Sequence, residues 1–187
     1  FALDGLSLKV MPGEIVCLVG ESGSGKSLSA GAIMRLLPEP HVHVAGGSLQ
    51  FEGEDILAKS EAEMRRIRGN RIAMIFQEPM TALNPQKTVG WQIDEVLRLH
   101  TKDGHKARKA RAIEMLERVH IPDPASAYNA YPHQISGGQR QRVMIAMALA
   151  LSPRLIIADE PTTALDVTTQ LQILKLIRDL QRDEGAG

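Results

Sequence analysis

The chain has 187 residues, which is enough for one domain with a sizeable buried core. Apolar residues make up 43% and aromatic residues only 3%, so we expect a mostly aliphatic core. Lys+Arg and Asp+Glu both number 22, and this zero formal charge argues against broad, sequence-independent nucleic-acid binding, which needs a positive surface.

The first 19 residues predict an antiparallel strand pair. Apolar and polar residues alternate over 6–10, a turn signal (MPGE) follows, and residues 15–19 (IVCLV) form an apolar run. We interpret Cys17, the single cysteine, as a buried small hydrophobe in a reducing compartment. No signal peptide is visible, and the longest apolar run, 143–151, is shorter than a membrane span, so we expect a soluble chain.

Residues 20–27 (GESGSGKS) match G-x-x-x-x-G-K-[ST] between that apolar run and a helix-like segment, 28–37. Glycines let successive backbone N–H groups point at phosphate oxygens, and the helix start adds partial positive charge. Lys26 is expected to reach the β/γ-phosphates and Ser27 to ligate Mg²⁺. The competing interpretation is a flexible Gly/Ser loop with an accidental lysine. The predicted nucleotide-binding residues here are Gly20, Glu21, Ser22, Gly23, Ser24, Gly25, Lys26, Ser27 and Leu28.

The segment that follows the helix is loop-like over 38–47, with a short strand expected over 48–51. His41 and His43 form an H-x-H pair, but without further ligands nearby they are better interpreted as loop histidines. Ser60 and Glu63 form a capping-box pattern that predicts a helix as far as Ile67.

Residues 71–76 predict a strand that ends at Gln77, and residues 77–85 (QEPMTALNP) then form a turn. A polar side chain at a strand end near a phosphate site is well placed to hold a metal or a water. A surface turn set by Pro79 and Pro85 is the alternative.

Residues 88–119 have a helical pattern, in two pieces broken near 102–104. The basic run 105–111 carries no interleaved aromatic residues, so it indicates a solvated helix face rather than a nucleic-acid patch. Ser136 is then a predicted N-cap for a helix running to about Leu151, and Gly137 and Gly138 at its start allow close approach to an anion.

Residues 155–158 predict an apolar strand that ends in two carboxylates, Asp159 and Glu160. In P-loop proteins an Asp at this position holds Mg²⁺, and a second carboxylate can orient and deprotonate a water. An acidic turn is the alternative. Asp166 is a plausible N-cap for a last helix, from Val167 to about Arg182.

Together, GESGSGKS, the Gln77 turn, ISGGQ, LIIADEP and ALD resemble the ATPase domain of ABC transporters over nearly the whole chain. The wording FQEPMTALNP and DEPTTALDV looks most like the dipeptide/oligopeptide import branch, which includes nickel and glutathione importers. The resemblance implies an α/β fold: a P-loop NTPase core with a mixed, mainly parallel sheet, flanking helices and an N-terminal antiparallel part. The core is expected over 1–85 and 152–187, and a helical subdomain over 86–151 ends in the signature helix.

The resemblance also implies an ATP hydrolase that uses ATP and Mg²⁺. Glu160 would be the general base, Gln77 would touch Mg²⁺ or the attacking water, and Asp159 would support Mg²⁺. The signature would contact ATP bound to the opposing subunit of a head-to-tail dimer, with Asp166 at that interface. Its residues are Ser136, Gly137, Gly138 and Gln139.

The implied partners are a second ATPase domain, identical or not, transmembrane permease subunits and, indirectly, a substrate-binding protein, at the cytoplasmic face of the membrane. Ile135 stands where the family usually has leucine, a volume-conserving change that we expect to be tolerated. The family's histidine after the last helix and its adenine-stacking aromatic have no counterpart here, so two alternatives stay open. One is a truncated nucleotide-binding module with little turnover, and the other is a soluble non-transport ABC ATPase.

Overall fold

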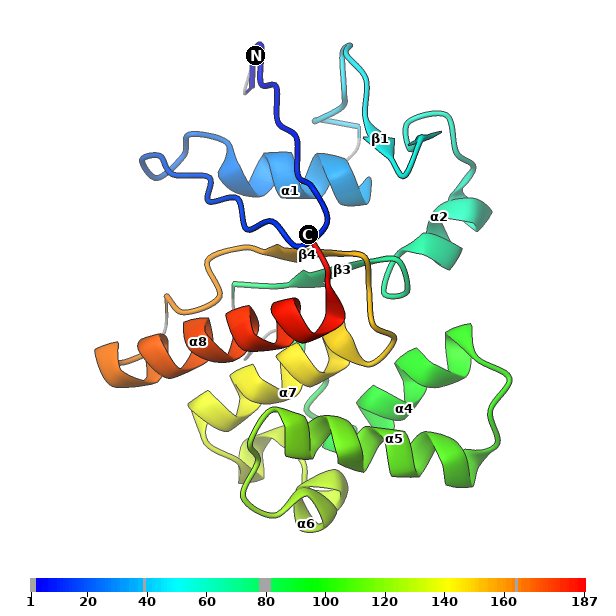
Figure 1. Cartoon of the computed structure of the whole chain (residues 1–187), viewed down its shortest axis with the longest axis vertical. Helices are drawn as coiled ribbons and strands as arrows, with labels where there is room; N and C mark the ends of the chain where they lie inside the picture. The colour runs from blue at the N-terminus through cyan, green and yellow to red at the C-terminus, as the bar shows by residue number, and fades with distance from the viewer. Residues whose placement is uncertain (1–2, 39, 78–81, 164) are drawn as a thin grey trace.

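The computed structural model describes residues 3–38, 40–77, 82–163 and 165–187. Two parallel strands, β3 (Ile72–Ile75) and β4 (Leu155–Ala158), lie at the middle of the molecule (Figure 1). Helix α1 (Lys26–Met34) lies on one side of them, and α7 (Gly137–Leu149) and α8 (Val167–Glu184) lie on the other. The α/β fold class with parallel pairing is confirmed.

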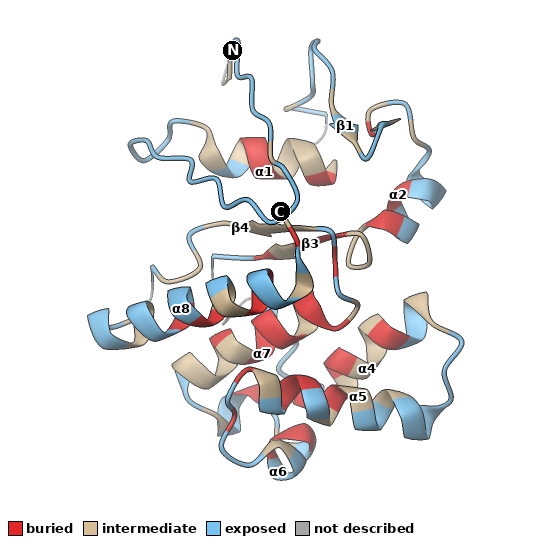
Figure 2. Ribbon diagram, viewed as in Figure 1, coloured by how far each residue is buried: buried red, intermediate tan, exposed pale blue. Residues whose placement is uncertain are grey.

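The β3–β4 pair separates two hydrophobic clusters because side chains alternate along a strand. Ile72 and Met74 pack into a smaller cluster with Met34 of α1. Ala73 and Ile75 face a larger cluster that includes residues of α7 and α8. The two strands therefore have helices on both faces, and Figure 2 shows the buried residues gathered on the sides of the helices that face this core.

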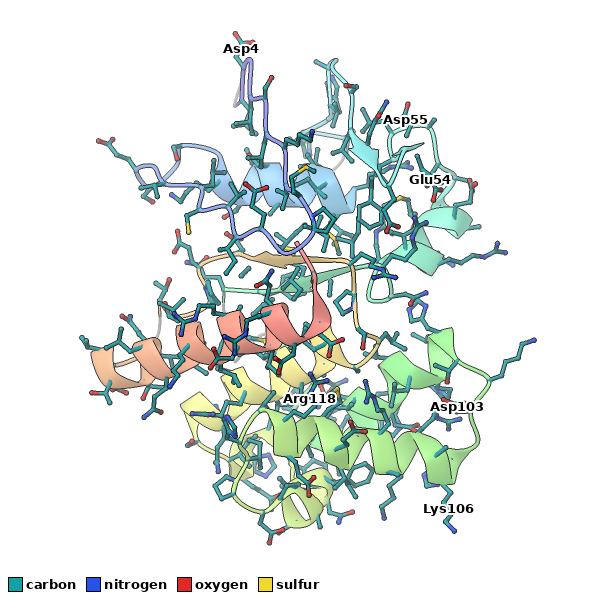
Figure 3. All side chains as sticks on the ribbon, in the orientation of Figure 1. Asp4, Glu54, Asp55, Asp103, Lys106 and Arg118 are labelled. Carbon is teal, nitrogen blue, oxygen red and sulfur yellow. The ribbon has the colours of Figure 1, made fainter. Side chains whose placement is uncertain are left out.

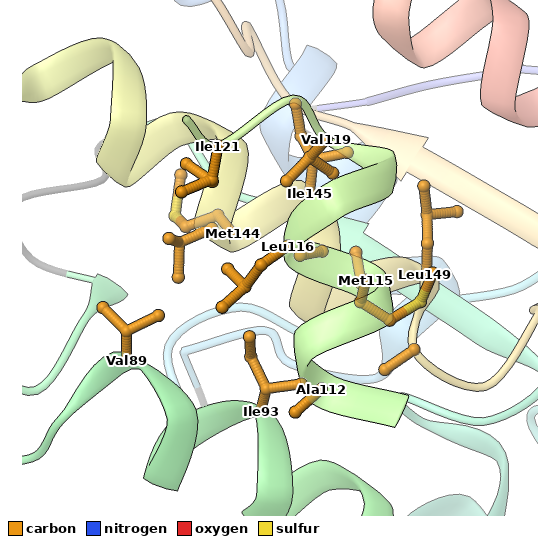
Figure 4. Packing of buried hydrophobic residues seen from close by; sticks show 14 of the residues in the cluster. Val89, Ile93, Ala112, Met115, Leu116, Val119, Ile121, Met144, Ile145 and Leu149 are labelled. Carbon is orange, nitrogen blue, oxygen red and sulfur yellow. The ribbon is translucent and has the colours of Figure 1, made fainter. Parts of the chain in front are cut away.

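The larger cluster continues into the helical segment between the strands. That segment consists of α4 (Val89–His100), α5 (His105–Arg118), α6 (Pro124–Asn129), a short 3₁₀ turn, η1 (Pro132–Gln134), and α7. Ile93, Leu116 and Ile145 are fully buried where α4, α5 and α7 meet (Figure 4). The two-piece helix predicted for 88–119 is confirmed, while the division into core and helical subdomain stays a prediction.

Three local predictions are confirmed, for a helix start, a short strand and a solvated helix face. In α2 (Glu61–Ile67), Ser60 and Glu63 form the expected capping box. The short strand predicted over 48–51 is β1 (Gln50–Phe51), which pairs antiparallel with β2 (Glu54–Asp55). Both residues of β2 are labelled in Figure 3. The basic run forms an exposed face at the start of α5, and Lys106 points away from the rest of the chain, as expected of a solvated helix face (Figure 3).

The strand predicted over 15–19 is wrong, and so is the antiparallel pair that was to include it. This segment is irregular and exposed, with Val19 90% accessible, and Cys17 is exposed rather than buried. A strand needs ladder partners. The edge of β4 opposite β3 instead bonds to the chain's last residue, because Ile156 N–H donates to the carbonyl of Gly187 and Gly187 N–H donates to that of Arg154.

An ion pair ties the helical segment to the end of α8. Arg118 Nη1 at the end of α5 lies 2.7 Å from Glu184 Oε1, and the two side chains are 26% and 12% exposed. Arg118 is labelled near the middle of Figure 3. Among the described residues, no helix has both the length and the apolar character needed to cross a membrane.

Glu184→Gln is expected to lower the free energy of unfolding at neutral pH by about 1–2 kcal/mol, since it removes a partly buried charge-assisted bond. Burial opposes ionisation of Glu184, but hydrogen bonds from Ser152 and Arg118 outweigh it and hold the pKa of Glu184 below 4.5. A carboxyl group whose pKa is lower in the folded than in the unfolded state stabilises the fold at pH values above its unfolded-state pKa. This contribution is lost as pH falls through the folded-state pKa.

The difference in unfolding free energy between wild type and Glu184→Gln should therefore shrink as denaturant titrations move from neutral pH to below 4.5. Glu117→Gln, which alters an exposed carboxylate of α5 next to Arg118 in the sequence, is the control and should change little at any pH. A difference that stays constant with pH would contradict the assignment.

Candidate active site

The backbone of the loop at residues 20–27 fits the predicted role in phosphate binding. Gly23 and Gly25 have φ angles of 82° and 93°, a region that residues with a Cβ rarely adopt. A Cβ on Gly20 would lie 2.6 Å from Ser24 Oγ, so a larger residue there would require the Ser24 side chain to shift. Helix α1 begins at Lys26, two residues earlier than expected, and the N–H groups of its first turn have no intrahelical acceptor.

Lys26 folds back across the loop. Its Nζ donates to the carbonyl of Gly20 at 2.8 Å and to that of Glu21 at 2.9 Å. The same Nζ lies 3.9 Å from Glu160 Oε1, a partner from the far end of the sequence. The ammonium group is therefore held over the loop, between the backbone that would cradle phosphates and the carboxylate predicted to act on water.

The carboxyl ends of β3 and β4 meet at one edge because the strands are parallel, with Ile75 opposite Ala158. Asp159 stays in the ladder, donating its N–H to the carbonyl of Ile75 at 3.0 Å. Its Oδ1 accepts a hydrogen bond from Ser27 Oγ at 3.0 Å. Gln77, which follows β3, donates from Nε2 to Glu160 Oε2 at 2.8 Å.

Predicted residues from three distant segments thus converge: Lys26 and Ser27, Gln77, and Asp159 and Glu160. The remainder of the predicted turn at 77–85 includes residues 78–81, which lie outside the described part of the chain. The oxygens of Ser27, Asp159 and Gln77 are hard donors of the kind Mg²⁺ prefers, so this donor set fits that ion. Among the described residues, His, Cys, Asp and Glu form no separate group of three or more suited to a metal.

A cavity of about 170 Å³ opens beside the loop, and its lining includes Gly20, Ser24 and Lys26 of the loop and Leu6 and Leu18 of the preceding segment. A larger one of about 260 Å³ lies elsewhere, between α1 and residues 43–57, and contains none of the predicted site residues. The smaller cavity is the one that borders the loop at 20–27, and Lys26 is the charged residue of its lining.

The signature residues lie on the other side of the strands. Ser136 Oγ accepts from Gln139 N–H at 3.2 Å, and Gln139 Oε1 accepts from Ser136 N–H at 2.8 Å, which forms a capping box at the start of α7. Helix α7 packs on the face of β3 opposite α1 (Figure 1). None of the hydrogen bonds described for Ser136 and Gln139 connects them to the loop at 20–27.

Asp166 caps α8 as predicted, accepting from Thr169 N–H at 3.0 Å and from Thr169 Oγ1 at 2.6 Å. The hydrogen bond from the Thr169 hydroxyl, and to a smaller extent the one from its N–H, hold the pKa of Asp166 below its usual value.

One contact of the predicted base was not predicted from the sequence. Thr163 Oγ1 lies 3.1 Å from Glu160 Oε2, and the available signal was a hydroxyl three residues after the carboxylate in a turn.

Comparison with known proteins gives a consistent result. A family model described as ABC transporter matches residues 3–163. The chain is 55% identical over 181 residues to the oligopeptide transport ATP-binding protein OppD of Bacillus subtilis, covering 97% of this chain and 51% of that protein. It is 54% identical over 184 residues to the dipeptide transport ATP-binding protein DppD of Escherichia coli, covering 98% and 56%.

Another relative, the peptidoglycan transport ATP-binding protein YejF of Agrobacterium fabrum, is 54% identical over 98% of this chain and 34% of its own length. The chain thus spans about a third to just over half the length of these relatives. The solved structure of the ATP-binding cassette MJ0796 with ADP and Pi superposes with a TM-score of 0.84 at 32% identity, covering 98% of this chain and 76% of that one. The chain belongs to the ABC transporter family and has the fold of its ATP-binding cassette.

Proposed function

We propose that this chain is the ATP-binding and ATP-hydrolysing part of an ABC importer for peptides or related small solutes. The observation that carries the proposal is the convergence of Lys26, Gln77 and Glu160 at the mouth of the phosphate-binding loop. The relatives named as dipeptide and oligopeptide transport ATP-binding proteins support the substrate class.

ATP would bind with its phosphates against the backbone N–H groups of the loop and the first turn of α1. Lys26, already folded over the loop, supplies a positive charge to the β/γ-phosphates. Ser27, Asp159 and Gln77 would hold Mg²⁺, which when bound neutralises charge on the phosphate oxygens.

Glu160 would act as the general base of hydrolysis. Its carboxylate takes a proton from a water whose oxygen forms a bond to the γ-phosphorus, while the bond from that phosphorus to the bridging oxygen breaks, giving ADP and inorganic phosphate. Lys26 Nζ lies 3.9 Å from Oε1, so the carboxylate is already directed toward the phosphate end of the site.

The placement of the two glycine-rich helix starts supports a dimer. Because α1 and α7 lie on opposite faces of β3, Ser136, Gly137, Gly138 and Gln139 do not close over the loop of their own chain. We propose that they contact ATP on a second ATPase subunit, with Asp166 at the interface. Permease subunits, a substrate-binding protein and a place at the cytoplasmic face of the membrane complete the proposed assembly.

A second candidate is a nucleotide-binding module with little turnover. It is favoured by the exposure of residues 15–19, which lead into the loop without ladder partners. An exposed segment holds the loop less firmly than a paired strand does. Turnover measurements separate the two candidates.

Lys26→Ala is expected to weaken binding of ATP by at least about 10-fold, because a positive charge at the phosphates is lost. Isothermal titration with Mg-ATP measures this. Lys9→Ala, an exposed lysine outside the loop, is the control and should bind like wild type. Equal affinity of Lys26→Ala and wild type would overturn the phosphate-binding assignment.

Glu160→Gln is expected to keep ATP affinity while phosphate release falls by about 10²-fold or more, since the amide is nearly isosteric but cannot accept the proton. Phosphate release under saturating Mg-ATP is the measurement. Turnover at the wild-type rate would remove Glu160 as the base. Wild-type turnover too slow to detect would favour the second candidate.

A further inference from the structure

The two oxygens of Glu160 have different surroundings. Oε2 accepts from Gln77 Nε2 at 2.8 Å and lies 3.1 Å from Thr163 Oγ1. Oε1 has Lys26 Nζ at 3.9 Å, on the side of the phosphate-binding loop. The carboxylate is therefore anchored through one oxygen and directed toward the loop through the other.

Thr163 is tied to Glu160 by backbone as well as side chain. Its N–H donates to the carbonyl of Glu160 at 3.3 Å, and its hydroxyl reaches that carbonyl at 3.2 Å in addition to Oε2. Both acceptors of the single hydroxyl proton belong to Glu160. Glu160 itself has a φ of 45°, a conformation uncommon for a residue with a side chain, so the turn has to hold it there.

We propose that Thr163 is a positioning residue for hydrolysis: its hydroxyl fixes Oε2 of Glu160, so that Oε1 is the oxygen that receives the proton from water. This inference rests on the proposed role of Glu160 as the base. Thr163 does not touch the reacting atoms and acts only through the orientation of Glu160.

The geometry explains why a second anchor matters. Glu160 is 39% exposed, so packing alone does not restrict rotation of its carboxylate. Gln77 approaches from the end of β3 and holds one oxygen through a single bond, about which the group can still turn. Thr163 approaches the same oxygen from the turn that follows Glu160. With both donors on Oε2, Oε1 faces Lys26 Nζ at 3.9 Å, beyond hydrogen-bond distance, and can accept from a water.

The test uses four variants in the full-length ATPase: Thr163→Val, Thr163→Ser, Glu160→Gln and Thr101→Val. Valine keeps the shape and the backbone N–H but removes the hydroxyl, whereas serine keeps the hydroxyl. Thr101 is the control: its Oγ1 accepts an exposed hydrogen bond from Asp103 N–H at 3.3 Å in the helical segment, away from Glu160. ATP affinity, KM and kcat are measured for each.

Thr163→Val is expected to lower kcat about 10-fold with ATP affinity and KM unchanged, because orientation of the base is loosened while the nucleotide site is intact. Thr163→Ser should restore most of the rate, and Thr101→Val should match wild type. A normal kcat for Thr163→Val, or a serine variant as slow as the valine variant, would overturn the inference even if Glu160→Gln is inactive. An active Glu160→Gln would instead overturn the role of Glu160 on which the inference rests.

Discussion

The parallel register of β3 and β4 is the constraint on which the candidate site depends. Pairing Ile75 with Ala158 brings the residues after each strand to the same edge, although 83 positions separate Gln77 from Glu160. A shift by one residue would turn the apolar side chains of β4 to the opposite cluster and misplace both carboxylates. The alternation of apolar side chains that packs the two clusters therefore also fixes where Gln77, Asp159 and Glu160 lie relative to one another.

Charge balance at that edge complements the register. Lys26 places one positive group near Glu160, and Ser27 satisfies one oxygen of Asp159. The side chains of Lys26 and Glu160 are 20% and 39% exposed, so water screens their attraction and the pair contributes little to stability. The pair instead preorganises the site: the Lys26 ammonium and the Glu160 carboxylate stay accessible to a nucleotide, and each is already oriented toward the other across the loop.

Local sequence signals predicted the parts of this structure that depend on local bonds. The caps at Ser60, Ser136 and Asp166 were predictable because each is satisfied within three residues of the cap. The segment at 15–19 was not, because its apolar pattern describes a strand only when neighbouring strands supply hydrogen bonds. The contact of Thr163 with Glu160 depends on a turn with positive φ at Glu160, which no periodicity reports.

The separation of the two glycine-rich helix starts is the feature that a single chain leaves unexplained on its own. Helix starts attract anions, yet the start of α7 lies across the β3–β4 layer from the loop that would bind phosphates. If both helix starts bind phosphate, a strand pair with one of them on each face can use both only when another subunit supplies the second half of each site. Two copies related head to tail would satisfy that requirement at two sites at once, so the face of β3 that each helix covers is consistent with the proposed dimer.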